Sequence, residues 1–276
     1  MQKSSNNSRQ PAIYGFTLVE VLVTISIIAV LIALAIPPLR TARLQAQSSE
    51  CLSRLKGLGE GMVIIEGRNG GSWPNLFRRD MRGEIQMFTT GTTQWGVYYF
   101  GQVALWQGSF VGVLWDEGDP AEVWTCPAVM RTGWGLRGGR EQLHEQQASG
   151  GIASYFYSPG LISEPAMWDP TDPTVREDRP GARRLVGVHE VRFPSRKASM
   201  AEVADFHGRS VRMAIEEDVD ALNALFADGH AERSRAADAT PGLPTRHMFW
   251  FDWGEVVRAP FLGTPWGAHG DDLAGR

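Results

Sequence analysis

GFTLVEVLVTISIIAVLIALAIPPLR, residues 15–40, is the stretch that decides the fold of this chain. From Phe16 to Leu39 it is apolar except for three hydroxyl residues and Glu20, its one ionisable residue. A helix needs roughly 20 apolar residues to cross the hydrocarbon core of a bilayer. The run therefore predicts a membrane-spanning helix over residues 16–39, close to the start of the chain.

Glu20 is unexpected there, because a carboxylate in a membrane segment is costly and usually has a partner. No Lys or Arg lies within helical reach of it, so we expect the partner to come from elsewhere. The preceding residues, MQKSSNNSRQPAIYG, carry two positive charges and no negative ones and end in Gly15. A cut after Gly15 would create an α-amino group on Phe16. A neighbouring copy, shifted along the helix axis, would be best placed to bring this amine to Glu20.

The order of these parts differs from an ordinary secretory signal, in which a short apolar region precedes the cleavage site. G-F-T-L-V-E followed by a long apolar run resembles the class III signal of type IV pilins and type II secretion pseudopilins. The resemblance implies that a prepilin peptidase cuts between Gly15 and Phe16 and N-methylates Phe16. It also implies that Glu20 aligns subunits during assembly and that the helix bends at Pro37.

The resemblance further implies a structural subunit of a type II secretion pseudopilus or a type IV pilus-like fibre, and no enzyme activity. Its partners would be the prepilin peptidase, other pilin or pseudopilin subunits, inner-membrane lipid and the secretion or pilus assembly machinery. The precursor would cross the inner membrane once, with its head in the periplasm, and could reach the cell surface after assembly. The alternative is a membrane-anchored protein whose tryptophan-rich head binds a polysaccharide or a surface protein.

Beyond Pro38 the chain turns polar but keeps a helical pattern. Five apolar residues at 3-3-4-3 spacing draw one stripe on a helix over residues 40–68: Leu52, Leu55, Leu58, Met62 and Ile65. Asn69-Gly70-Gly71 is a stop signal for this helix. We therefore expect a leader (1–15), an assembly helix (16–39), an amphipathic continuation (40–68) and a head (69–276).

The head alternates strand-like runs with turn residues, which predicts an α+β fold with an antiparallel sheet behind the long N-terminal helix. The expected strands are 95–106, 109–115, 122–129, 153–158, 184–193, 198–206, 221–227 and 247–253. A net charge of −4 becomes −6 when Lys3 and Arg9 leave with the leader. Nucleic-acid binding is not expected of such an acidic body, because phosphate contacts need clustered Lys and Arg.

LFADGHAE, residues 225–232, contains Asp228-Gly229, a pair that favours a two-residue hairpin with a type I′ turn. The stretch resembles the C-terminal signature of a large pseudopilin-like family, common in planctomycete-type bacteria, in which a histidine precedes Asp-Gly by nine residues. In this chain Asp218 holds the position of that histidine. ECLSRLKGLGEGM after the apolar run, GSWP at 71–74 and TCPAV at 125–129 also resemble that family.

The two cysteines, Cys51 and Cys126, permit a disulfide in an exported protein, but both thiols can also be free. Two D-x-H pairs, Asp205-x-His207 and Asp228-x-His230, each put two side chains on one strand face. Adjacent strands would combine them into a four-ligand metal site; otherwise they are polar residues near turns.

Four acidic residues in the loop 163–183 offer hard oxygens to calcium, or are simply solvated: Asp169, Asp172, Glu177 and Asp178. GWGLRG at 133–138 matches G-x-G-x-x-G but lacks a βαβ context, which indicates a glycine-rich loop. No set of residues typical of a catalytic site is present. The sequence thus predicts no cofactor, with calcium as the alternative.

Overall fold

The structure, a computed structural model, describes residues 17–73, 77–79, 85–87, 125–132, 154–177, 184–208, 210–216, 218–246 and 256–273. They form two compact units that divide between Arg43 and Leu44. The leader (1–15), Phe16, the glycine-rich loop 133–138 and the predicted strands at 95–106, 109–115 and 247–253 lie outside the described residues.

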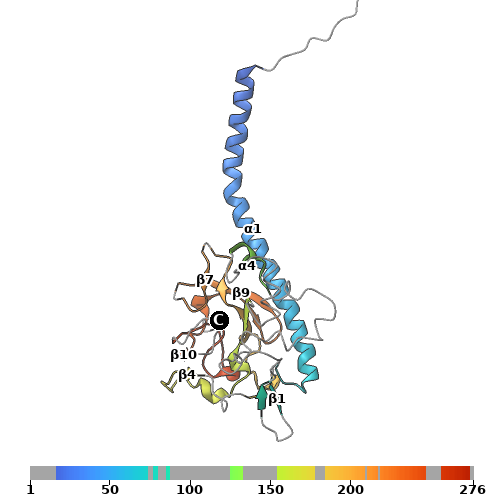
Figure 1. The fold of residues 1–276 in the computed structure, drawn as a ribbon, viewed down its shortest axis with the longest axis vertical. Coiled ribbons are helices and arrows are strands. Elements are labelled where there is room, and N and C mark those ends of the chain that lie inside the picture. Colours follow the sequence, from blue (N-terminus) through green and yellow to red (C-terminus); the bar gives the residue numbers. More distant parts are fainter. Residues whose placement is uncertain are drawn as a thin grey trace, which may run out of the picture. The chain divides into compact units, whose positions relative to one another are not determined.

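In the first unit the chain is helical from the start of α1 (Leu18–Arg68) (Figure 1). Its large apolar side chains between Leu18 and Leu39 are exposed, and the helix is long and apolar enough to cross a membrane. The hydroxyls of Thr24 and Ser26 donate to the carbonyls of Glu20 and Leu22, at 2.6 and 2.7 Å, so they add no unsatisfied polar group.

The helix continues through Pro37 and Pro38, although neither has a backbone N–H to donate. A bend at Pro37 therefore stays a prediction. The last turn of α1 ends as the sequence indicates, because the Gly71 N–H donates to the Glu66 carbonyl at 2.8 Å and Gly70 has a φ of 66°. This is the six-to-one bond of a Schellman motif, in which glycine takes the left-handed conformation.

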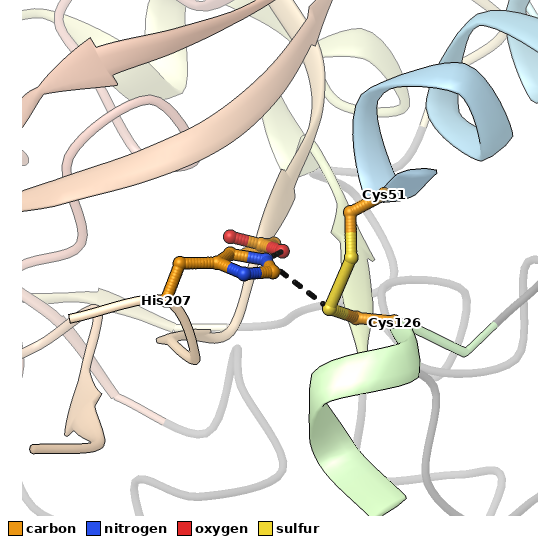
Figure 2. A group of neighbouring side chains, drawn as sticks. Cys51, Cys126 and His207 are labelled. Carbon is orange, nitrogen blue, oxygen red and sulfur yellow. Dashed lines mark hydrogen bonds and ion pairs between the residues drawn. A yellow bond between two sulfur atoms is a disulfide. The ribbon is translucent and has the colours of Figure 1, made fainter. Parts of the chain in front are cut away.

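In the second unit, the remaining part of α1 buries one face. Leu55, Leu58, Met62 and Ile65 are buried as the 3-3-4-3 spacing predicts, whereas Leu52 is only partly buried. Cys51 takes the buried place beside them. It forms a disulfide with Cys126, which directly precedes helix α4 (Pro127–Thr132), and so ties α1 to α4 (Figure 2).

The second unit is built on a four-stranded antiparallel sheet of order β3-β5-β8-β9. Its strands are β3 (Tyr155–Tyr157), β5 (Ala198–Glu202), β8 (Ala221–Phe226) and β9 (Ala231–Arg235). Every residue of β3, β5 and β8 is buried, so both faces of these strands are covered. The long helix followed by an antiparallel sheet confirms the predicted α+β fold.

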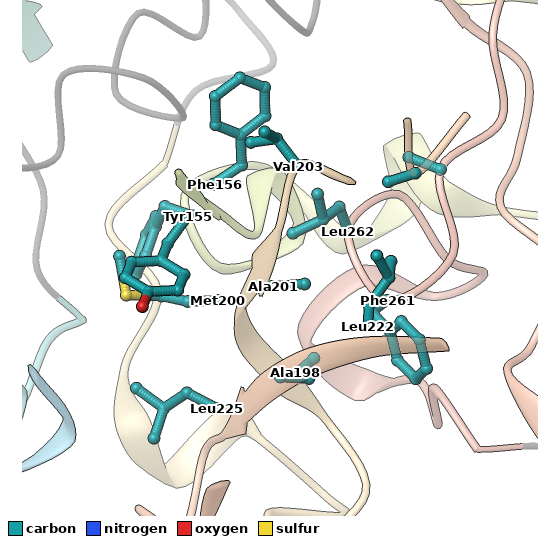
Figure 3. Close-up of a cluster of buried hydrophobic side chains, with 14 of the residues drawn as sticks. Tyr155, Phe156, Ala198, Met200, Ala201, Val203, Leu222, Leu225, Phe261 and Leu262 are labelled. Atoms are coloured by element: carbon teal, nitrogen blue, oxygen red, sulfur yellow. The ribbon is translucent and has the colours of Figure 1, made fainter. Parts of the chain in front are cut away.

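The two faces of the sheet are covered by different segments. Figure 3 shows Tyr155, Met200 and Leu225 on one side of β5, and Phe261 and Leu262 on the other. The helix reaches the first side, because a Cβ added at Gly59 of α1 would lie 3.0 Å from the Leu225 side chain. The glycine at position 59 thus allows α1 to approach β8 closely.

Short strands and 3₁₀ turns complete the described residues. The strand pairs are β1 (Phe77–Arg79) with β2 (Ile85–Met87), β4 (Arg176–Glu177) with β10 (Thr245–Arg246), and β6 (Ala204–Asp205) with β7 (Arg212–Met213). The 3₁₀ turns are η3 (Pro159–Leu161), η4 (Pro165–Trp168), η6 (Val188–Glu190), η7 (Ala236–Asp238) and η8 (Gly267–His269).

Two of the expected strands are wrong in part. The end of the expected strand 122–129 belongs to α4, because Pro127 suits the first turn of a helix. The expected strand 184–193 contains η6, where the Glu190 carboxylate accepts the Gly187 N–H at 2.8 Å.

The sequence had predicted a type I′ turn between β8 and β9, but the structure shows a different turn. Gly229 has a φ of 86°, but Asp228 has no positive φ. The Gly229 N–H donates to the Phe226 carbonyl and the Phe226 N–H to that of His230, both at 2.9 Å. These bonds define a three-residue loop, in which a type I turn is followed by a glycine in the left-handed conformation. An Asp-Gly pair suits this loop as well as a type I′ turn.

A buried ion pair joins β5 to the C-terminal segment. The Lys197 ammonium donates to the Asp272 carboxylate and to the Thr264 hydroxyl, each at 2.9 Å. The other oxygen of Asp272 accepts the Ala198 N–H at 2.8 Å. The side chains of Lys197 and Asp272 are fully buried, so each charge depends on the other for its stabilisation.

Candidate functional site

Glu20 is bound to the N-terminus of its own helix. Its Oε2 accepts the Thr17 N–H and the Thr17 hydroxyl, both at 2.8 Å, while the Glu20 N–H donates to the Thr17 hydroxyl at 3.2 Å. This reciprocal arrangement is a capping box, with Thr17 as N-cap and Glu20 as third helical residue. The carboxylate also lies where the helix dipole favours negative charge.

This role was not among the predictions from the sequence, although T-x-x-E before an apolar run is the signature of a capping box. Both donated bonds go to Oε2, and Oε1 accepts no hydrogen bond from the described residues. The capping box involves the Thr17 N–H, which a cut after Gly15 would leave in place. A processed chain would thus keep a carboxylate that is fixed in position and still has one oxygen to offer.

The Asp-Gly signature stretch lies on the β8–β9 hairpin. Asp228 and His230 pair with each other at 2.5 Å in this exposed turn, and the His230 ring stacks on Phe226. Asp218, ten positions before Asp228, pairs with Arg212 at 3.1 Å in a surface ion pair.

The second D-x-H pair lies inside the second unit. Asp205 accepts hydrogen bonds from the backbone N–H of His207 at 3.0 Å and from Arg233 at 2.8 Å. The His207 imidazole points toward the disulfide (Figure 2). Among the described residues, the two D-x-H pairs do not come together as one ligand group; the group that does form is a different one.

That group is a buried cluster around the disulfide, composed of Cys51, Cys126, Glu202 and His207. The Nε2 atom of His207 lies 3.3 Å from Cys126 Sγ and 3.1 Å from Glu202 Oε1. Because a carboxylate only accepts, Nε2 carries the proton in this arrangement. Only His207 could have been suspected from a local motif, because the four residues come from distant parts of the chain.

Further polar groups hold the cluster in place. Asn223 donates its backbone N–H to Glu202 Oε2 at 3.1 Å and its side-chain amide to Oε1 at 3.2 Å. The Ser48 hydroxyl donates to the Asn223 side chain at 3.2 Å, and the Ser154 hydroxyl accepts the Cys126 N–H at 2.5 Å. Burial raises the pKa of the neighbouring Tyr155, and the negative charge of Glu202 raises it further.

The loop proposed for calcium is organised around a guanidinium group. Arg176 is buried and donates to four backbone carbonyls of this loop, those of Met167, Asp169, Asp172 and Thr174. The side chains of Asp169 and Asp172 accept the N–H groups of Thr171 and Thr174, at 2.8 and 2.9 Å. Four carbonyls of the loop are therefore bound to an internal cation, and calcium binding by its carboxylates stays a prediction. The Glu177 side chain and Asp178 lie outside the described residues.

One carboxyl group at the end of α1 has a perturbed pKa. Burial raises the pKa of Glu66 to about 7, and the described residues place no cation beside it. The charge of Glu66 in turn adds to the burial that raises the pKa of Tyr157. This part of the helix therefore changes charge close to neutral pH.

Comparison with known proteins identifies the N-terminal segment. Residues 12–36 match the family model of the prokaryotic N-terminal methylation motif. No curated protein and no solved structure matches the chain. The motif indicates a precursor of the pilin or pseudopilin type, a structural rather than enzymatic family, and implies processing by a prepilin peptidase and assembly with other pilin subunits. Together with the apolar helix, it fits single-pass membrane anchoring.

Proposed function

We propose that this protein is a structural subunit of a type II secretion pseudopilus or a type IV pilus-like fibre. The precursor is cut between Gly15 and Phe16, Phe16 is N-methylated, and the helix over residues 16–39 mediates assembly. The observation that carries the proposal is the methylation motif at residues 12–36, which leads directly into an apolar helix with exposed side chains.

The exposed apolar side chains have two successive environments in this proposal. In the precursor they contact lipid acyl chains in the inner membrane. After processing they pack against the helices of other subunits, so the same surface serves as anchor and as assembly interface. The continuous helix supports this use, because the large apolar side chains from Leu18 to Leu39 form one exposed surface along it.

Glu20 sets the register between subunits. The Thr17 cap fixes its carboxylate at the helix start and leaves Oε1 without a partner among the described residues. The new amine of Phe16 on a neighbouring subunit binds this oxygen only when the two helices are offset along the fibre axis. The charge pair then selects one arrangement of subunits, as buried polar pairs do in some assemblies.

We place the head in the periplasm, on the outer side of the inner membrane. The buried Cys51–Cys126 disulfide supports this location, because disulfides persist in oxidising compartments. The stretch at 225–232 supports a place in the pseudopilin-like family common in planctomycete-type bacteria, with Asp218 as its departure from that family's signature. Secretion or pilus genes next to the gene for this chain would identify the fibre system that uses the subunit.

Processing is tested by N-terminal sequencing and intact mass of the membrane-extracted protein. We expect Phe16 as first residue, with the mass of one added methyl group. An intact residue 1, or a cut at another bond, would contradict the proposal.

Assembly is tested with two variants that separate the charge of Glu20 from its capping role. Glu20→Gln keeps a side chain suited to a capping box and removes the charge, so we expect normal insertion and cleavage but loss of fibre incorporation. Thr17→Ala removes the hydroxyl of the cap but keeps the charge and the backbone N–H that also binds the carboxylate, so incorporation should continue. Wild-type incorporation of Glu20→Gln would show that the charge has no part in assembly.

The alternative is a membrane-anchored binding protein with a tryptophan-rich head, and seven of its ten tryptophans lie outside the described residues. Trp73 and Trp168 are buried in the core, whereas Trp266 is exposed. Glu20→Ala separates the two functions. This change abolishes co-assembly in the fibre proposal and changes nothing if anchoring alone matters.

A further inference from the structure

The buried cluster around the disulfide contains the donor atoms of a metal site. Two cysteine sulfurs, an imidazole nitrogen and a carboxylate oxygen all lie within 4.8 Å of one another. Cys51 comes from α1, Cys126 from the start of α4, Glu202 from the end of β5 and His207 from the turn after β6. Thiolate, imidazole and carboxylate are the three ligand types that proteins use for zinc.

We propose that, once the Cys51–Cys126 disulfide is reduced, these four side chains bind one zinc ion. The ion then links α1 to α4 in place of the disulfide. The second unit thus has two alternative cross-links at one position, a covalent one under oxidising conditions and a metal one under reducing conditions. This inference goes beyond the fibre proposal and does not depend on it.

The spacing of the donor atoms supports zinc. Bonds of about 2.0–2.3 Å in a tetrahedral site put neighbouring ligand atoms about 3.3–3.8 Å apart. In the structure, His207 Nε2 is already 3.3 Å from Cys126 Sγ and 3.1 Å from Glu202 Oε1. The two bonded sulfurs have to move apart, which reduction of their bond allows, and every pair of donor atoms is already within 4.8 Å.

The surroundings are those of a structural site. Cys51, Cys126 and Glu202 are fully buried, and His207 is 8% exposed, so four protein ligands close the coordination sphere. A catalytic zinc keeps an open position for water, whereas a structural zinc does not. The two hydrogen bonds from Asn223 orient the Glu202 carboxylate, as outer-shell groups do around bound metals.

A dithiol can act as the reductant that opens the disulfide before zinc binds. The dithiol transfers two electrons and two protons to the disulfide, which leaves two protein thiols and an oxidised dithiol. Zinc then displaces one proton from each thiol, and both protons leave to solvent. His207 binds through the lone pair of Nε2 while its proton moves to Nδ1, and Glu202 binds as the carboxylate.

The test compares the oxidised and reduced full-length chain in detergent micelles. Each form is incubated with zinc chloride and desalted, and bound zinc is measured by mass spectrometry of the elements. We expect one zinc ion per reduced chain, none above background in the oxidised chain, and a higher melting temperature of the reduced chain with zinc. Cobalt in place of zinc should give the visible bands of a tetrahedral site and a thiolate charge-transfer band.

If the reduced chain does not stay folded without metal, zinc present during refolding should restore its near-ultraviolet circular dichroism, because metal binding then drives folding. A reduced chain that retains no zinc and is not restored by it overturns the proposal. Equal binding of zinc by the oxidised chain overturns it as well, because the sulfurs are then not ligands.

Two variants and a control identify the ligands. His207→Gln keeps the disulfide, so the melting temperature of its oxidised form reports folding, and its reduced form should lose the bound zinc. Asn223→Ala should lower zinc affinity by about 10–100-fold. His230→Gln, in the exposed Asp228 pair, is the control and should keep wild-type affinity. Wild-type affinity in His207→Gln would place the ion elsewhere and overturn the assignment.

Discussion

Replacing Asp272 by asparagine should destabilise the second unit strongly, because it removes the only carboxylate that the described residues place against the buried Lys197 ammonium. The amide oxygen of the new side chain can still accept the Ala198 N–H, which Asp272 now accepts at 2.8 Å. The ammonium, however, keeps only neutral partners such as the Thr264 hydroxyl at 2.9 Å. Both side chains of the pair are fully buried, so solvent cannot compensate for the lost charge.

Breaking a buried ion pair on one side typically costs about 3–5 kcal/mol. In a protein of this size each kcal/mol lowers the melting temperature by about 2–4 °C, which gives a decrease of about 6–20 °C. The pair also connects β5 to the C-terminal segment, where the Asp272 N–H donates to the Arg196 carbonyl at 2.8 Å. We therefore expect the loss of this segment's packing to accompany the decrease.

The assay is thermal and urea unfolding of the full-length chain in detergent, followed by near-ultraviolet circular dichroism with the disulfide intact. Lys197→Met and the double variant Lys197→Met/Asp272→Asn complete a double-mutant cycle. Because the double variant has no uncompensated charge, it should lose less stability than the two single variants together. A loss below about 1 kcal/mol for Asp272→Asn, or strict additivity in the cycle, would refute the reasoning.

Three further changes test other features of the fold. Arg176→Met should cost at least about 1.5–3 kcal/mol, the range for one charged hydrogen bond, and calcium chloride should leave the melting temperature of the wild type unchanged. Because the pKa of Glu66 is raised to about 7 in the folded chain, the unfolded chain loses this proton at lower pH. Stability should therefore fall as pH rises from about 4.5 to 7, and in Glu66→Gln the urea midpoint should vary less with pH over that range. Reducing the Cys51–Cys126 bridge without metal should cost about 4.5 kcal/mol in the chain-entropy model, for a separation of 75 residues, as measured by urea unfolding with and without dithiol.

Local patterns predicted the parts of the fold that depend on local physics. The apolar stripe, the glycine stop after Arg68 and the position of the β8–β9 hairpin follow from periodicity and turn chemistry. The type of that turn did not, because Asp-Gly suits more than one loop length. The strand expected around Cys126 was wrong because its β-like residues were weighed without the effect of Pro127.

The candidate sites also differ in whether a local sequence pattern could reveal them. The role of Glu20 in the capping box was readable from T-x-x-E, since both partners lie within one helical turn. The cluster of Cys51, Cys126, Glu202 and His207 was not readable, because strand pairing and helix docking bring together residues that no spacing connects. The acidic loop shows a related effect: its pattern of acids did not reveal that Arg176 places a cation against the loop carbonyls, and calcium binding there stays a prediction.

The disulfide also changes the route by which mechanical load passes through the chain. A pulling force applied to the N-terminal part of α1 reaches Cys51 first and then has a covalent path to Cys126 across the sulfur–sulfur bond. Residues 52–125 lie outside that path, so tension between the helix and the sheet strands bypasses them. The chain between the end of α1 at Arg68 and Cys126 can therefore vary in length without lengthening the load-bearing backbone, which would be useful in the proposed subunit, held by one end.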